Sequence, residues 1–278
     1  MKPRNGGKLS CTLVPVVSEP SWRLKIRRAV DHFNELQKIV EQYQARNRYR
    51  AVGVAPPQDE PTRWRFVLEI TEPPDPQIAV VLGDCLFNIR SALDHIAVAC
   101  APRSRSRDAG FPIVKDPGNE KQVEKYESQT RGMAPEVVAA IEFEQPYNMT
   151  KRDPRAGPES VDALFALSAL QNADKHRSLI VLVPGLSHPT ARALWADEAL
   201  GIMSPKYLEA GADVMRWDEF GNRIRYEDVR VDVKGISRVS VVVAGRRDPY
   251  ELVPLAGGIL GRVRDRIIPN LEPHAGSS

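Results

Sequence analysis

Two clusters of residues in this sequence carry side chains suited to proton transfer or phosphate binding. The first cluster contains Arg90 and His95, which lie five positions apart in the sequence. A histidine near its ordinary pKa can take a proton from a ribose hydroxyl or give one to a leaving oxygen. A guanidinium can stabilise a charged phosphate. These two residue types are therefore sufficient for RNA cleavage without a metal, and Arg90 and His95 are the candidate catalytic residues.

Three further polar residues of the first cluster are candidates for binding: Asn88, Ser91 and Asp94. Asp94 follows Arg90 by four positions, a spacing at which two helical side chains can form an ion pair. In that alternative, Arg90 and Asp94 pair at the surface and His95 bonds to a neighbouring loop, so the cluster braces the fold. A similar run, Arg27 to His32, lies in merely basic surroundings, which favours a structural role.

The second cluster follows Asn172 and consists of four charged or polar residues: Asp174, Lys175, His176 and Arg177. The three basic side chains can gather an anion while Asp174 orients His176. The alternative is that they complement the negative carboxyl end of a helix, which is a common stabilising arrangement. The sequence leaves both interpretations of this cluster open.

The first half of the chain reads as helices interrupted by one pair of strands. Apolar residues three or four apart predict long helices over 22–43 and 78–100. Between them, apolar and polar residues alternate over 63–70, which indicates a half-buried strand. Residues 51–54 are expected to pair with it, so a β-hairpin is inserted between the two helices. Shorter helices are expected over 119–130, 135–143 and 160–173.

The second half alternates with a period of two residues and ends in one helix. Strands are expected over 178–183, 191–195, 212–217, 229–233 and 239–243, with a turn at 234–237 between the last two. A terminal helix over 255–268 is expected to close the sheet. The fold class is therefore α+β, with a helical bundle and hairpin over 1–173 and an antiparallel sheet with its helix over 174–278. The two parts can share one core.

The helix that carries Arg90 and His95 resembles the HEPN superfamily of ribonucleases, toxins and defence proteins. In that family an Arg-x4–6-His motif on a long helix forms a composite site across a dimer. The resemblance implies metal-independent RNA cleavage with His95 as acid or base, Arg90 on the phosphate and Ser91 as the polar residue after the arginine. Residues five apart on a helix point about 140° apart. A homodimer is therefore expected if both act on one phosphate.

A second resemblance covers roughly residues 84–183. The Asn-x-Arg-Ser-x-Leu-Asp-His helix, a Gln-Pro-Tyr helix end and the Asp-Lys-His-Arg junction look like a set of uncharacterised bacterial proteins. This resemblance implies no activity.

Composition narrows the class of protein. The 278 residues carry 39 Lys and Arg against 36 Asp and Glu, so the formal net charge of +3 is low for a dedicated nucleic-acid binder. No apolar run is long enough to span a membrane. The three cysteines, Cys11, Cys85 and Cys100, have no metal-binding spacing, which indicates reduced thiols and a cytoplasmic protein. No cofactor or metal is expected.

Two functions remain open on these grounds. The first is a HEPN-like RNA-binding protein or metal-independent endoribonuclease, with RNA as partner and a homodimer as the active form. The alternative is a non-catalytic bacterial binding or scaffold module whose polar clusters are structural. The first hypothesis gains support if His95 and His176 line one open cleft, and loses it if each lies against separate partners.

Overall fold

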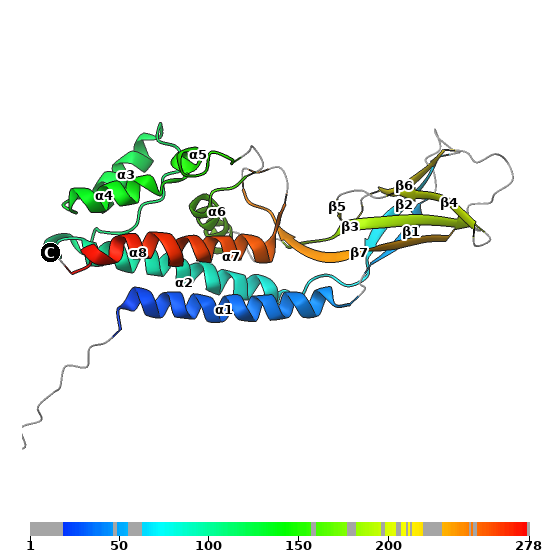
Figure 1. Ribbon diagram of the computed structural model, residues 1–278, viewed down its shortest axis with the longest axis horizontal. Helices are drawn as coiled ribbons and strands as arrows, with labels where there is room; N and C mark the ends of the chain where they lie inside the picture. Colours follow the sequence, from blue (N-terminus) through cyan, green and yellow to red (C-terminus); the bar gives the residue numbers. More distant parts are fainter. Residues whose placement is uncertain are drawn as a thin grey trace, which may run out of the picture.

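The structure is a computed structural model of the chain. Long helices form a bundle, and a β-stranded arm projects from one end of it (Figure 1). The predicted α+β class is confirmed. The residues that the structure describes are 19–46, 49–54, 63–156, 160–176, 182–195, 198–203, 207–209, 211, 213–218, 230–244, 246 and 249–276.

Helices α1 (Ser21–Gln44) and α2 (Gln77–Cys100) lie side by side along the bundle (Figure 1). Both helices begin directly after a proline. Proline is disfavoured inside a helix because it lacks an N–H, but it is tolerated at the start of one. The carboxylate of Asp75 accepts a hydrogen bond from the Gln77 N–H at 2.9 Å, so it satisfies one of the free donors of α2. The predicted hairpin is confirmed, with β1 (Tyr49–Val54) antiparallel to β2 (Arg63–Ile70).

Short helices follow α2 and cover one side of the bundle. Asn119 accepts a hydrogen bond from the Gln122 N–H and so caps the N-terminus of α3. Asp162 does the same for α6 by accepting from Leu164 and Phe165, so this helix starts later than residue 160, the predicted start. In chain order the elements are η1 (Arg103–Arg105), α3 (Glu120–Thr130), α4 (Pro135–Phe143), η2 (Pro146–Asn148), α5 (Met149–Arg152) and α6 (Ala163–His176).

The C-terminal helix belongs to the bundle. It runs beside α1 and α2 through α7 (Leu252–Arg262), a π-helical turn η5 (Val263–Ile267), α8 (Ile268–Leu271) and a last short turn η6 (Glu272–His274) (Figure 1). A Cβ added at Gly257 would lie 3.1 Å from the Phe33 ring, so the glycine permits a close approach to α1. This helix packs mainly on α1 and α6 and also contacts β7 and β8, so the expectation that it closes the sheet holds only loosely.

The strands form two sheets. One has the order β1-β2-β6, with β6 (Asp213–Asp218) antiparallel to β2. The strand expected over 212–217 therefore extends the N-terminal hairpin. The other sheet has the order β4-β3-β7-β8, and β5 also pairs with β3; its strands are β3 (Leu182–Trp195), β4 (Glu198–Met203), β5 (Tyr207–Glu209), β7 (Arg230–Val241) and β8 (Tyr250–Glu251).

The turn expected at 234–237 is wrong, because these residues continue strand β7. Their partner β3 is also one long strand, so 191–195 is its second half. The register of the pair shifts between Ser187 and Thr190 on β3. Pro189 lies in this interval and has no N–H for the ladder. Gly235 of β7 thus lies opposite the register shift of β3, and this irregularity explains why its sequence resembles a turn.

The buried apolar residues form one cluster that takes members from α1, α2, α6, β7 and the terminal helix. Val239 and Val241 of β7 belong to it together with Leu36 and Ile89 of the long helices. The core therefore draws on both sides of position 173. None of the helices within the described ranges is long and apolar enough to cross a membrane.

Two buried cysteines, Cys85 and Cys100, lie on the core side of α2 and are unpaired thiols. Burial raises the pKa of Cys85 to about 12 and that of Cys100 to about 11, so both stay protonated near neutral pH. The Cys85 thiol donates to the Ala29 carbonyl at 3.4 Å, which records the close contact of α1 with α2. Cys11 lies outside the described residues.

Candidate functional site

Arg90 is held by its own helix and by the segment that follows α2. Its Nε and Nη2 donate to the two carboxylate oxygens of Asp94 at 3.1 and 2.9 Å. Nη2 also donates to the Phe111 carbonyl at 2.7 Å, and the Phe111 N–H donates back to Asp94 at 3.1 Å. These four hydrogen bonds form a closed set, the Arg90–Asp94 clamp. The ion pair expected from the i, i+4 spacing is confirmed, and it fastens the backbone of the next segment.

His95 is half-buried, and its Nδ1 atom is buried without a hydrogen-bond partner among the residues that the structure describes. A histidine that moves protons is normally oriented by a partner on its second ring nitrogen. The neighbouring carboxylate of Asp94 is occupied by Arg90 and Phe111. Within the described part of this chain, nothing therefore fixes the imidazole for catalysis.

Asn88 of the first cluster lies where α1 packs against α2. It is buried, and its amide donates to the Asp84 carbonyl one turn earlier at 2.9 Å. Its side-chain oxygen accepts from Lys25 of α1 at 3.5 Å. Asn88 therefore helps to join the two long helices. Ser91 is half-buried on the same helix.

The second cluster begins at the end of α6, which contacts α2 far from His95. A Cβ at Gly83 would be 3.2 Å from both carboxylate oxygens of Asp174, so the end of α6 packs closely on α2 there. Gly83 precedes His95 by 12 positions, which is about 18 Å along a helix axis. The structure therefore does not bring Asp174 to His95. The side chains of Lys175 and His176, and all of Arg177, lie outside the described part of the chain.

The run from Arg27 to His32 also has structural partners. Arg27 forms an exposed ion pair with Glu19 just ahead of α1. His32 is buried on α1, with its Nδ1 3.9 Å from a carboxylate oxygen of Glu35. Among the described residues, Arg27 and His32 thus have different partners.

The extended segment after the basic loop, residues 110–116, is fixed by side chains. Gln145 is fully buried; its oxygen accepts from the Val114 N–H at 2.8 Å and its nitrogen donates to the Pro112 carbonyl at 3.1 Å. The oxygen of Gln122 accepts from the Lys115 N–H at 2.8 Å. Buried backbone groups need such partners, and here side chains replace a neighbouring strand. The sequence does not reveal that the two glutamines bind this segment, because their backbone partners do not follow from local spacing.

A pocket of about 250 Å³ lies between this segment, α3 and α6, and we call it the Lys115 pocket. Helix α3 lines it with one face, since its residues are three or four positions apart, and α6 adds two residues at i, i+4. The helical lining residues are Gln122, Lys125, Tyr126, Gln129, Ser168 and Asn172. No carboxylate lines the pocket among the described residues. Asn172, which introduces the second sequence cluster, is thus the member of that region that reaches a cavity.

The cation of the Lys115 pocket is partly removed from water. The Lys115 ammonium lies 5.1 Å from the centre of the Phe165 ring. Burial lowers the pKa of Lys115, because the charged form loses hydration. The pKa of Tyr126 is raised, first by burial and then by the negative charge of Glu142. Lys115 and Lys125 thus line the pocket together with amide and hydroxyl groups.

A second polar region lies where α5, α6 and α7 meet, next to a pocket of about 390 Å³. Arg152 forms an ion pair with Asp162 and lies 4.0 Å from Glu144, which also pairs with Arg262. Arg152 donates further to the Phe143 and Gln145 carbonyls. Two cations meet two carboxylates, so we call this set the buried ion network.

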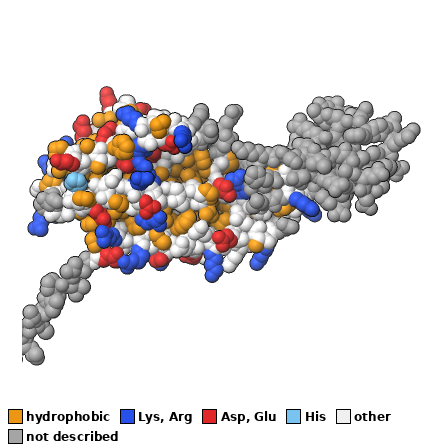
Figure 2. All heavy atoms as spheres, in the orientation of Figure 1, with side chains coloured by type: hydrophobic (Ala, Val, Ile, Leu, Met, Phe, Trp, Pro, Cys, Tyr) orange, Lys and Arg blue, Asp and Glu red, His pale blue; other side chains and the backbone are white. Residues whose placement is uncertain are grey.

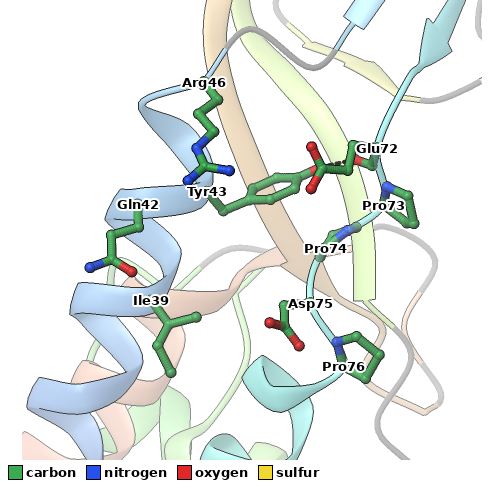
Figure 3. Close-up of a pocket in the computed structure, with 9 residues that line it drawn as sticks. All are labelled: Ile39, Gln42, Tyr43, Arg46, Glu72, Pro73, Pro74, Asp75 and Pro76. Carbon is green, nitrogen blue, oxygen red and sulfur yellow. Dashed lines mark hydrogen bonds between the residues drawn. The ribbon is translucent and has the colours of Figure 1, made fainter.

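A third pocket, of about 420 Å³, lies where the bundle meets the arm (Figure 3). The end of α1 forms one wall and the proline-containing segment 72–76 forms the other. The Tyr43 hydroxyl donates across the gap to the Glu72 carbonyl at 3.0 Å. Arg46 lines the pocket from the α1 side, and the acidic residues Glu72 and Asp75 line it from the other.

The bundle surface is mixed in charge. Figure 2 shows basic, acidic and apolar side chains interspersed over the visible face of the bundle, without one continuous basic field. Within the described ranges, no three histidine, cysteine, aspartate or glutamate side chains come together as a metal site. Comparisons with family models, with curated proteins and with solved structures found no match to this chain.

Proposed function

We propose that this chain is a non-catalytic binding or scaffold module in which the polar residues of α2 brace the fold. The observation that carries this proposal is the Arg90–Asp94 clamp. The guanidinium that a nuclease would place on a phosphate donates to Asp94 and to the Phe111 carbonyl. A phosphate would have to displace hydrogen bonds to a charged group, each worth about 1.5–3 kcal/mol.

The position of His95 supports the same proposal. Its Nδ1 is buried, and the described part of the chain supplies no partner that would set the tautomer. The alternative, a HEPN-like endoribonuclease, needs both side chains free to meet one RNA phosphate across a homodimer. The clamp directs Arg90 toward residue 111 of its own chain.

A cytoplasmic location is part of the proposal. The two buried cysteines of α2 are unpaired thiols that stay protonated. Such thiols suit a reducing compartment.

RNA cleavage in the presence of EDTA tests the proposal. Wild type, His95→Ala and Arg90→Met are incubated with mixed RNA, and His274→Ala, a change in a half-buried histidine of η6, serves as the matched control. We expect the same RNA pattern for all four proteins and for buffer alone. Cleavage by wild type that disappears in His95→Ala and persists in His274→Ala would overturn the proposal and favour the ribonuclease. Light scattering on the same samples then shows whether the cleaving form is a dimer.

A further inference from the structure

We propose that the Lys115 pocket binds a compact oxyanion, of which phosphate is the simplest example. The terminal phosphate of a small metabolite shares this chemistry. The inference deepens the binding function proposed above, names a ligand class for it and rests on it.

The charge of the pocket is unmatched. No carboxylate of the described residues forms an ion pair with Lys115, whose contact is the face of the Phe165 ring. Lys125, on the lining face of α3, adds a second positive charge at the rim. A buried cation that has lost hydration and has no carboxylate partner lowers the stability of the fold. An oxyanion in the pocket would supply the missing charge, and lysine is a common point-charge partner of phosphate.

The pocket also presents hydrogen-bond donors. The oxygen of Gln122 is occupied by the N–H groups of Lys115 and Asp116, which leaves its amide nitrogen as a donor. Ser168 and Asn172 on α6 supply a hydroxyl and a second amide. Several neutral donors around one cation are the arrangement expected for an anion with more than one oxygen atom.

The walls of the pocket are fixed before a ligand arrives. The segment 112–115 is held by the Arg90–Asp94 clamp at Phe111, by Gln145 at Pro112 and Val114, and by Gln122 at Lys115. A preformed site loses less entropy on binding than one that must be ordered. The volume of about 250 Å³ lies below the range of about 300–1,000 Å³ typical of sites for drug-sized molecules, which favours a compact ligand.

Isothermal titration calorimetry on the full chain tests the inference, with sodium phosphate, sodium sulfate and methyl phosphate at equal ionic strength. Wild type is expected to bind both phosphate and sulfate. Lys115→Met, which keeps an unbranched chain over the Phe165 ring, should weaken phosphate binding by about tenfold or more, as expected for a charge-assisted hydrogen bond. Lys121→Met, on the same helix α3 as the lining residues but outside the pocket, is the matched control and should bind as wild type does.

Tighter binding of methyl phosphate than of phosphate would identify an ester as the ligand, and the reverse order would identify the free ion. Either order retains the ligand class.

Two results would overturn the inference: no phosphate binding by wild type, or equal losses in Lys115→Met and Lys121→Met. Thermal unfolding without phosphate shows whether each variant is folded. Failure here leaves the structural role of Arg90 intact. Conversely, RNA cleavage that depends on His95 overturns the proposed function, whether or not phosphate binds.

Discussion

The buried ion network and the Lys115 pocket use positive charge in opposite ways. In the network, Arg152 and Arg262 meet Glu144 and Asp162, and Arg152 also caps two backbone carbonyls. In the pocket, Lys115 lies on an aromatic ring and no acid lines the cavity in the described part of the chain. The network contains more charge, yet the pocket contains the charge that remains available to a ligand.

This difference applies to the first sequence cluster as well. Arg90 has the residue type and position of a phosphate-binding group, but its hydrogen bonds go to Asp94 and Phe111. The types of residues in a cluster therefore predict what chemistry is possible. The partners of those residues decide whether the fold has already used it.

The largest effect is expected for the network. Arg152→Met would leave Asp162 and Glu144 buried without their shared cation, since their side chains are only 10% and 4% exposed. Removing one partner of a buried pair costs about 3–5 kcal/mol, so we expect a loss of that order in the free energy of unfolding by urea. Lys151→Met, the exposed neighbour, should change it by less than about 0.5 kcal/mol. Similar values for the two variants would remove the contrast between network and pocket.

The next effect is expected at the clamp. Arg90→Met removes the bonds to Asp94 and to the Phe111 carbonyl, and we expect it to destabilise the protein by about 1–3 kcal/mol. The side chain is 20% exposed, which keeps the effect below that at Arg152. Arg107→Met in the exposed basic loop is the matched control. Urea unfolding of both variants checks this, and an unchanged midpoint in Arg90→Met would contradict the bracing role.

Lys115→Met should show the opposite sign. Because burial lowers the pKa of Lys115, the fold destabilises its charged form. Replacement by methionine is expected to leave the thermal unfolding temperature unchanged or slightly higher in phosphate-free buffer. Added phosphate should stabilise wild type but not this variant. A marked loss of stability without phosphate would show that the cation is needed by the fold itself.

The smallest effect concerns the end of the C-terminal helix. Arg23 donates to Glu272 at 2.7 and 3.0 Å and lowers the pKa of that carboxyl, with a further contribution from Trp22. A lowered pKa gives stability that is present above the unfolded-state value, about 4.3, and is lost as pH falls through the folded-state value. Glu272→Gln should therefore lose slightly less stability than wild type between neutral pH and acid, as followed by thermal unfolding. An identical pH profile would show that the ion pair does not contribute.

The sequence predicts the helices of the bundle and the hairpin well, because their apolar spacing and prolines are local signals. It predicts the sheets less well. The residues at 234–237 have turn-like chemistry but lie in β7, opposite the irregularity at Pro189 of β3. Likewise, nothing local shows that β6 pairs with β2.

The candidate site, like the fold, was predicted only where its contacts are local in the sequence. The pairing of Arg90 with Asp94 follows from a four-residue spacing, and the structure confirms it. The Phe111 carbonyl, the two glutamines that hold residues 112–115 and the unmatched Lys115 depend on contacts between segments far apart in the chain. Asn172 was noted only as the start of a charged cluster, whereas its place in a cavity depends on how α3 packs beside α6.

The amide hydrogen of Phe111 reports most directly on whether Arg90 and Asp94 brace the fold, since it donates to Asp94 at 3.1 Å. Its exchange with solvent deuterium can be followed by NMR in wild type and in Arg90→Met, with amides in the middle of α2 as the internal reference. We expect exchange at Phe111 to become about tenfold faster or more in the variant, while the reference amides slow or quicken much less. Equal exchange at Phe111 in the two proteins would contradict the bracing role and leave Arg90 free for another partner.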